Sequence, residues 1–162
     1  MWQAPQPGYI KLNVDASILS DKAFIAVIAR DCGGSLIKAW TKQAVTLDPA
    51  MAEAAAINWA LELALAEGFI NILVESDAKI CVDALLGPLD KCPWKIRTVT
   101  EHSLELACLF PSCNFSWGRR DANQMAHALA KVAPSCCLPF SCLFHSLPPS
   151  VKEAWSRDLL AL

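Results

Sequence analysis

The clearest pattern along the chain is an alternation of apolar and polar side chains near its N-terminal end. In residues 8–17, GYIKLNVDAS, every second position is apolar: Ile10, Leu12 and Val14. A period of two is typical of a strand with one strongly apolar face. Residues 23–29 and 35–40 are further apolar stretches of strand length, separated by a turn built on a glycine pair. These three strands, joined by short turns, predict an antiparallel meander.

The middle of the chain predicts an alternation of helices and strands. Residues 50–67 are rich in Ala, Leu and Glu and are followed by Gly68, which is typical of a helix closed by a C-terminal glycine. The apolar run at residues 70–75 follows this crossover helix, so we expect it to be a strand parallel to the first one. Residues 78–86 predict a second helix, and apolar side chains at helical spacing in residues 91–109 predict a third.

The last third of the chain predicts one more strand, at residues 113–117, and one more helix, at residues 121–132. Asp121 has the position and spacing of a helix cap. Residues 134–150 are rich in Pro, Ser and Cys and predict a loop. Residues 151–162 could form a short terminal helix that packs on the body or stays loose.

The predicted order is strand, strand, strand, helix, strand, helix, helix, strand, helix. This order predicts an α/β domain with a five-stranded mixed sheet, in which three antiparallel strands are followed by parallel strands and helices flank the sheet. We expect an N-terminal extension at residues 1–8 and a folded domain at residues 9–133. A Pro- and Cys-rich loop with a short helix is expected at residues 134–162.

Composition and charge exclude several function classes. The 162 residues are 54% hydrophobic and 19% charged, which is typical of a well-packed domain. No apolar run reaches the roughly 18 residues that a membrane span needs, and the first residues lack the features of a secretory signal. We therefore expect an intracellular protein, nuclear or cytoplasmic, without a membrane partner, and we infer no obligate protein partner. The formal charge of −2 means that binding to nucleic acid would depend on a local patch or on metal ions.

The chain has 8 Cys, but it contains no Cys-x-x-Cys spacing, and we expect these residues to be reduced. Cys137, Cys142 and His145 lack a fourth ligand at a familiar spacing, so a structural zinc site is not expected there.

Three acidic residues fall at special places in the pattern. Asp15 ends the first predicted strand, Asp77 follows the strand at residues 70–75, and Glu53 lies in the first turn of the helix at residues 50–67. Each has a simpler explanation: a turn for Asp15, the helix dipole for Glu53 and helix capping for Asp77. Parallel pairing of the two strands would bring the three to one edge, where clustered carboxylates repel one another unless a cation lies between them. An all-oxygen site favours Mg²⁺ or Mn²⁺.

Five blocks of the sequence together resemble a known family. In chain order they are LNVDAS, AVIARDCGGSLIKA, AEAAAINWALELA, ILVESDAKICVDAL and RRDANQMAHALAK. They are similar to the ribonuclease H fold, and specifically to the plant reverse-transcriptase-like ribonuclease H domains. The resemblance covers residues 11–132 and implies a ribonuclease H-like fold for the predicted α/β domain.

The resemblance implies a two-metal endonuclease that cuts the RNA strand of an RNA–DNA hybrid. In the family, four acidic residues hold two Mg²⁺ (or Mn²⁺) ions, and Asp15, Glu53 and Asp77 fall at the first three of these positions. His127 takes the fourth, because the family pattern Asn-x-x-Ala-Asp is NQMAH here, starting at Asn123. These four side chains are the candidate catalytic residues and metal ligands. An imidazole can bind a metal ion, but it adds no negative charge and suits Mg²⁺ less well than a carboxylate does.

The start of the last helix supplies the candidate contacts to nucleic acid, which are Arg119, Arg120 and Asn123. Arginine side chains there could hold the phosphate backbone. The sequence also departs from the family: the loop that often carries a histidine has Gly118 and the two arginines instead. The basic, Trp-containing segment between the second and third helices is modest; it consists of Lys91, Trp94, Lys95 and Arg97.

Three functions therefore remain open. The first is a metal-dependent endoribonuclease whose activity is reduced by His127. The second is a catalytically inactive module that binds nucleic acid and descends from a retroelement-like ribonuclease H. The third is a scaffold that contacts other proteins through the Cys- and Leu-rich C-terminal segment.

Overall fold

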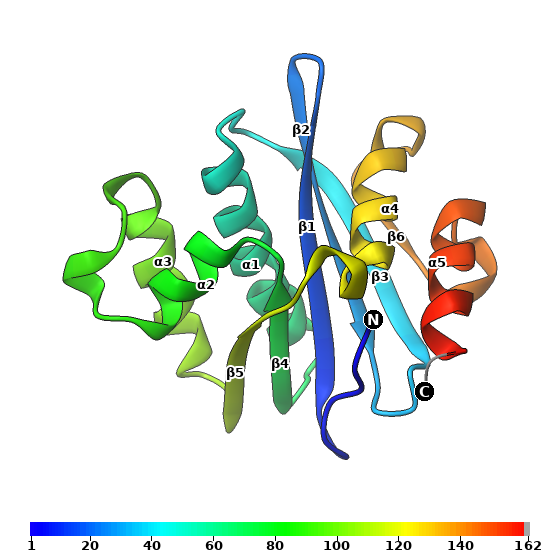
Figure 1. Ribbon diagram of the computed structural model, residues 1–162, viewed down its shortest axis with the longest axis horizontal. Helices are drawn as coiled ribbons and strands as arrows, with labels where there is room; N and C mark the ends of the chain where they lie inside the picture. Colours follow the sequence, from blue (N-terminus) through cyan, green and yellow to red (C-terminus); the bar gives the residue numbers. More distant parts are fainter. Residues whose placement is uncertain (161–162) are drawn as a thin grey trace.

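The computed structural model of the protein describes residues 1–160. The strands are β1 (Ile10–Leu19), β2 (Lys22–Arg30), β3 (Leu36–Ala44), β4 (Asn71–Ser76), β5 (Ser112–Trp117) and β6 (Phe140–Cys142). The helices are α1 (Pro49–Ala66), α2 (Lys79–Leu86), α3 (Trp94–Ala107), α4 (Gln124–Val132) and α5 (Pro149–Leu159). Figure 1 shows the sheet between α1, α2 and α3 on one side and α4 and α5 on the other. Within residues 1–160, no helix has both the length and the apolar character needed to cross a membrane.

The strands form one mixed sheet, whose order over the described residues is β5-β4-β1-β2-β3-β6. The pairs β1–β2 and β2–β3 are antiparallel, whereas β4 is parallel to both β1 and β5. The predicted α/β class, with three antiparallel strands followed by parallel strands, is therefore confirmed.

A sixth strand extends the predicted five-stranded sheet. β6 lies inside residues 134–150, which the composition predicts as a loop, and it pairs antiparallel with β3 at residues 39–41. Without β6, these residues of β3 would belong to an edge strand with unpaired backbone groups, which a short partner strand can satisfy. The loop prediction is wrong at β6 because three residues are too few to show a periodic pattern.

Two helices begin later than predicted. The third helix begins at Trp94, directly after Pro93, because the residue before a proline is disfavoured in helical conformation. The fourth begins at Gln124, and residues 120–122 form a separate 3₁₀ turn, η2. The predicted capping role of Asp121 is therefore wrong, because Asp121 lies in η2 and not at the start of α4.

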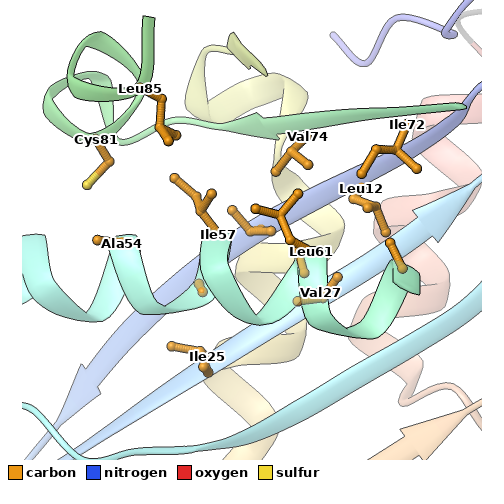
Figure 2. Packing of buried hydrophobic residues seen from close by; sticks show 14 of the residues in the cluster. Leu12, Ile25, Val27, Ala54, Ile57, Leu61, Ile72, Val74, Cys81 and Leu85 are labelled. Carbon is orange, nitrogen blue, oxygen red and sulfur yellow. The ribbon is translucent and has the colours of Figure 1, made fainter. Parts of the chain in front are cut away.

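The larger core lies between the sheet and α1. Ala60 and Ala64 of α1 are fully buried, and their small side chains let the helix approach the strands closely. Figure 2 shows Ile57 and Leu61 of α1 packed against Leu12 of β1 and its neighbours. This packing fixes α1, and therefore Glu53 near its N-terminal end, against the strands that carry the other acidic residues.

The second core lies on the opposite face of the sheet. Met125 and Leu129 of α4 are fully buried against Ile28 of β2, and α5 adds Val151 and Ala154. The terminal helix, which the pattern predicts over residues 151–162, thus packs on the body. Residues 161 and 162 lie outside the described part of the chain.

Buried polar side chains occupy the second face of β1 and its neighbours. The Nζ atom of Lys11 lies 2.7 Å from Oε2 of Glu75, and Nδ2 of Asn13 donates to Oε1 of Glu75 at 3.0 Å. On the same face, Nη1 of Arg30 lies 2.7 Å from Oδ2 of Asp158 in α5. Buried charges are costly unless they are paired, so these contacts hold β1 to β4 and tie α5 to the sheet.

The segment before β1 also packs on the body. Trp2 is 2% exposed, its Nε1 donates to Oδ1 of Asn13 at 2.9 Å, and Cζ of Arg30 lies 4.0 Å from the centre of its ring. Both segments that flank residues 9–133 thus contribute buried side chains. The predicted division at residues 9 and 133 stays a prediction.

Candidate metal centre

Three carboxylates meet at the edge where β1, β4 and α1 converge. The parallel register pairs Val14 with Ser76, which brings Asp15 beside Asp77. Glu53 reaches the same place from α1; because the helix begins at Pro49, Glu53 lies in its second turn and not in the first turn, as the sequence predicts. The backbone N–H of Ala16 in β1 donates to Oε1 of Glu53 at 3.3 Å. One oxygen of each of the three carboxylates lies within 4.8 Å of the other two. The predicted juxtaposition is therefore present.

The simpler explanations for these acids do not hold. Asp15 opens no turn, because β1 continues four residues further, to Leu19. The pattern predicts Asp15 at the end of the strand, but the structure places it inside the strand. Asp77 does not cap α2, whose N-cap residue is Ala78, and instead accepts a hydrogen bond from Arg120. Glu53 is partly buried and turned toward β1 rather than tilted into water.

The charges of Asp15 and Glu53 are only partly compensated by the protein. Burial, and then the charges of Asp15 and Asp77, raise the pKa of Glu53 to about 9. Burial also raises the pKa of Asp15, although the hydrogen bond with His127 opposes this rise. Among residues 1–160, Oδ1 of Asp15 and Oε2 of Glu53 are buried without a hydrogen-bond partner. A cation between the carboxylates would relieve both conditions.

These donors fit a hard divalent cation. All of the ligand atoms that the three acids offer are carboxylate oxygens, which Mg²⁺ and Mn²⁺ prefer. Two of those oxygens, on Asp15 and Glu53, are buried without a hydrogen-bond partner among the described residues. The predicted metal type therefore fits the residues present; the identity and number of ions stay a prediction.

His127 is brought to the same cluster by α4. Its Nδ1 lies 2.8 Å from Oδ2 of Asp15, and its side chain is 20% exposed. The structure thus places the imidazole where the sequence pattern predicts the fourth ligand. In the described structure its Nδ1 is engaged with Asp15 rather than free to coordinate a cation.

Arg120, which the sequence predicts to contact nucleic acid, contacts the carboxylate cluster through Asp77. Its Nε donates to Oδ2 of Asp77, and its Nη1 lies 2.9 Å from Nδ1 of His127. Desolvation opposes the charge of the guanidinium, but Asp77 and then Asp15 raise its pKa. Arg119, the other predicted arginine, is exposed and lines a neighbouring cleft of about 320 Å³ together with Trp117 and Glu75.

Asn123 has a structural position that does not support a contact with nucleic acid. It is 1% exposed, and its Nδ2 donates to the backbone oxygen of Val14 at 2.7 Å. This bond joins the start of α4 to the residue before Asp15. Asn123 therefore positions His127 and Asp15 relative to each other.

Two features of the site were missed by sequence reasoning. A Cβ atom on Gly118 would lie 2.9 Å from Cδ of Glu75, so a larger residue there would have to displace the Glu75 side chain, which Lys11 holds at 2.7 Å. The indole Nε1 of Trp117 donates to the backbone oxygen of Asp77 at 3.2 Å and supports that turn. The glycine that directly follows a predicted strand is the signal that could have indicated the close approach.

The other predicted features are weak. In the basic segment before and within α3, Lys95 pairs with Asp48 at 3.0 Å and Arg97 with Glu101 at 3.3 Å, so part of the segment's positive charge is neutralised.

All eight cysteines are unpaired thiols. Over residues 1–160, the three acids are the only group of His, Cys, Asp and Glu with metal-binding geometry.

Comparisons with known proteins agree with the fold. A family model described as reverse transcriptase-like matches residues 13–133. No match was found among curated proteins. Among solved structures, RNase H1 from the halophilic archaeon Halobacterium salinarum NRC-1 superposes with a TM-score of 0.72 at 22% sequence identity, covering 78% of this chain and 98% of that one.

Two further similar structures contain an RNA/DNA hybrid. LC11-RNase H1, isolated from compost by a metagenomic approach, has a TM-score of 0.68 at 18% identity. The match covers 75% of this chain and 94% of the LC11-RNase H1 chain. The foamy viral protease-reverse transcriptase has a TM-score of 0.61 at 13% identity, with 76% of this chain matching 19% of that protein. At these identities the likeness shows the fold alone.

The family model is the stronger comparison, because it covers most of the chain and includes all four candidate ligands. The narrower expectation of a plant subgroup stays a prediction. The chain belongs to the reverse transcriptase-like family and has a ribonuclease H-like fold.

Proposed function

We propose that the protein is a metal-dependent endoribonuclease that cuts the RNA strand of RNA–DNA hybrids, with its activity reduced by His127. The observation that carries this proposal is the meeting of Asp15, Glu53 and Asp77 within 4.8 Å. Two of their buried oxygens have no protein partner among the described residues. Such an arrangement is unfavourable for a purely structural cluster, because like charges at short range raise one another's pKa.

The chemistry would come from two bound Mg²⁺ or Mn²⁺ ions, which neutralise charge and orient the attacking and leaving oxygens at phosphorus. Asp15, which is fully buried, would be the central ligand. Glu53 and Asp77 would supply the other carboxylate ligands. Because Asp15 and Asp77 lie at paired strands and Glu53 on a packed helix, their positions are fixed before substrate binds.

The proposed substrate rests on the relatives and on the surface beside the cluster. LC11-RNase H1 and the foamy viral protein were solved in complex with RNA/DNA hybrids. Here, the cleft lined by Trp117 and Arg119 lies next to Asp77, so a phosphate backbone held by Arg119 would pass close to the carboxylates. Contacts to 2′-hydroxyl groups would distinguish the RNA strand from the DNA strand.

Cleavage of a labelled hybrid in Mg²⁺ and in Mn²⁺ tests the proposal. We expect cleavage by the wild type, and a loss on the order of a hundredfold or more in Asp77→Asn, since losing even a residue that only orients a metal ligand costs about 10- to 100-fold. The matched control is Asp83→Asn, because Asp83 is an exposed acid of α2 that pairs with Lys79 at 2.7 Å, away from the cluster. Equal activity in the wild type and Asp77→Asn, or none in either, would contradict the proposal.

The alternative is an inactive module that binds nucleic acid. The observation that favours it is the engagement of His127 Nδ1 with Asp15 at 2.8 Å, where a fourth carboxylate would otherwise add a negative charge. Hybrid binding that persists in EDTA and in Asp77→Asn, without any cleavage by the wild type, would support this function over the nuclease.

A further inference from the structure

The guanidinium of Arg120 occupies a position among the carboxylates that a surface arginine does not ordinarily take. Its Nε donates to Oδ2 of Asp77, whose side chain is only 8% exposed. Its charge also acts on Asp15 and on Glu53. Arg120 is therefore a positively charged group belonging to the protein that partly compensates all three acids.

The contact between Arg120 and His127 is not what holds the guanidinium there. Nδ1 of His127 lies 2.8 Å from Asp15 and 2.9 Å from Nη1 of Arg120. A ring nitrogen carries either one proton or one lone pair, so Nδ1 cannot donate to Asp15 and accept from Arg120 at the same time. If Nδ1 donates to Asp15, Arg120 can donate only to Nε2 of His127, at the longer distance of 3.4 Å. The carboxylate of Asp77, which carries a full negative charge, is thus the stronger partner of the guanidinium.

The backbone of Arg120 is held independently of its side chain. Its carbonyl oxygen accepts from the backbone N–H of Asn123 at 3.1 Å and from Nε2 of Gln124 at 2.8 Å. The side chain itself is 56% exposed. It can therefore turn outward into solvent while η2 and α4 keep their places.

We propose that Arg120 competes with divalent cations for Asp77, so that a metal ion binds only when the guanidinium moves out of the cluster. The inference deepens the proposed function and rests on it, because it concerns the same carboxylates. An oxygen that accepts from a guanidinium offers less negative charge to a metal ion, and the two cations repel each other at this distance. Once displaced, the guanidinium remains at the rim, where a nucleic-acid phosphate would attract it.

Metal binding without nucleic acid tests this competition. Mn²⁺ is titrated into the wild type, Arg120→Met and Lys79→Met, with binding followed by calorimetry and by the electron paramagnetic resonance signal of free Mn²⁺. Lys79 is the matched control, because it is an exposed cation two residues from Asp77 that pairs with Asp83 instead. We expect Mn²⁺ to bind about tenfold more tightly to Arg120→Met, equivalent to about 1.4 kcal/mol. Lys79→Met should bind as the wild type does.

Thermal unfolding gives a second readout. In EDTA, Arg120→Met should unfold at a lower temperature than the wild type, and added Mn²⁺ should raise its unfolding temperature by more than it raises that of the wild type. Equal Mn²⁺ affinity in the wild type and Arg120→Met would overturn the inference and leave the proposed function standing. Absence of Mn²⁺ binding in all three proteins would overturn both.

Discussion

His127 provides a ring nitrogen at a position where an acid would give the cluster a fourth negative charge. Its Nδ1 lies 2.8 Å from Asp15, so an aspartate placed there would face the same space. We expect His127→Asp to increase hybrid cleavage in Mg²⁺ by roughly tenfold, the lower end of the effect of one metal-site residue. The change is measured as the initial rate on a labelled hybrid.

His127→Asn is the control for this change, because it alters the size and polarity of the side chain without adding a charge. It should not increase the rate. If His127→Asp leaves the rate unchanged, or if His127→Asn raises it equally, then the imidazole does not limit the reaction.

Glu53 makes the stability of the fold depend on pH. Burial, with Asp15 and Asp77, raises its pKa from an ordinary 4.5 to about 9. Between these values the folded protein keeps a proton on Glu53 that the unfolded chain releases. The contribution of Glu53 to the free energy of unfolding should therefore be highest below pH 4.5 and should fall as the pH rises toward about 9.

Glu53→Gln, which cannot ionise, should flatten this decline. Urea unfolding in EDTA at several pH values between 4.5 and about 9 measures the effect. Saturating Mg²⁺ or Mn²⁺ should flatten the wild-type decline as well, because a bound cation stabilises the ionised carboxylate. Parallel pH curves for the wild type and Glu53→Gln in EDTA would show that Glu53 is not the group responsible.

At the scale of elements, α5 is joined to the sheet by a buried ion pair. Nη1 of Arg30, which is 0% exposed, lies 2.7 Å from Oδ2 of Asp158. Removing one partner of a buried pair leaves the other charge uncompensated, so Asp158→Ala should destabilise the fold by about 3–5 kcal/mol. Denaturant unfolding measures this loss.

The same helix offers a matched control. Glu153 pairs with Arg157 at 3.0 Å, but both side chains are mostly exposed. Glu153→Ala should therefore change the free energy of unfolding by less than about 1 kcal/mol. If Asp158→Ala costs no more than Glu153→Ala, the buried ion pair contributes no more to the stability of the fold than the exposed one does.

At the scale of the whole molecule, the low net charge limits how strongly the protein can bind nucleic acid. The formal charge is −2, and Lys95 and Arg97 are already paired with acids. The logarithm of the hybrid-binding constant should thus fall with the logarithm of salt concentration with a slope of roughly −3 or shallower, since each neutralised phosphate contributes about −0.9. Fluorescence anisotropy over a range of salt concentrations measures this slope.

Arg119→Ala should weaken binding uniformly across sequences and reduce the size of that slope by about 1, as expected for one lost phosphate contact. Glu101→Gln is a useful comparison, because it releases Arg97 from its ion pair and should steepen the slope if the basic segment contacts the hybrid. If the slope is unchanged in Arg119→Ala, the phosphate backbone of the hybrid does not pass through the cleft that Arg119 and Trp117 line.

The sequence was most informative where a local pattern had a direct structural meaning. The alternation around Leu12 and the helix after Pro49 predict their elements well, and parallel pairing of the strand at residues 70–75 follows from the crossover helix. That pairing is enough to bring Asp15 next to Asp77. The resemblance then places His127 at the same site.

What the sequence could not provide depends on contacts between distant residues. The sixth strand has three residues and exists because β3 offers it backbone partners. The hydrogen bond from Asn123 to Val14 joins positions 109 apart and turns a predicted surface residue into a buried one. Likewise, the contact of Arg120 with Asp77 spans 43 positions, and only the fold reveals that this cation lies on the acids.

The short strand β6 has a consequence for how the molecules behave in concentrated solution. An open sheet edge can recruit a strand from another copy and start aggregation. β6 blocks β3 at residues 39–41, in the middle of that edge. A chain that ends before residue 134 would leave β3 open to strands of neighbouring molecules, and in an assay of the proposed function its aggregation would be mistaken for a lack of activity.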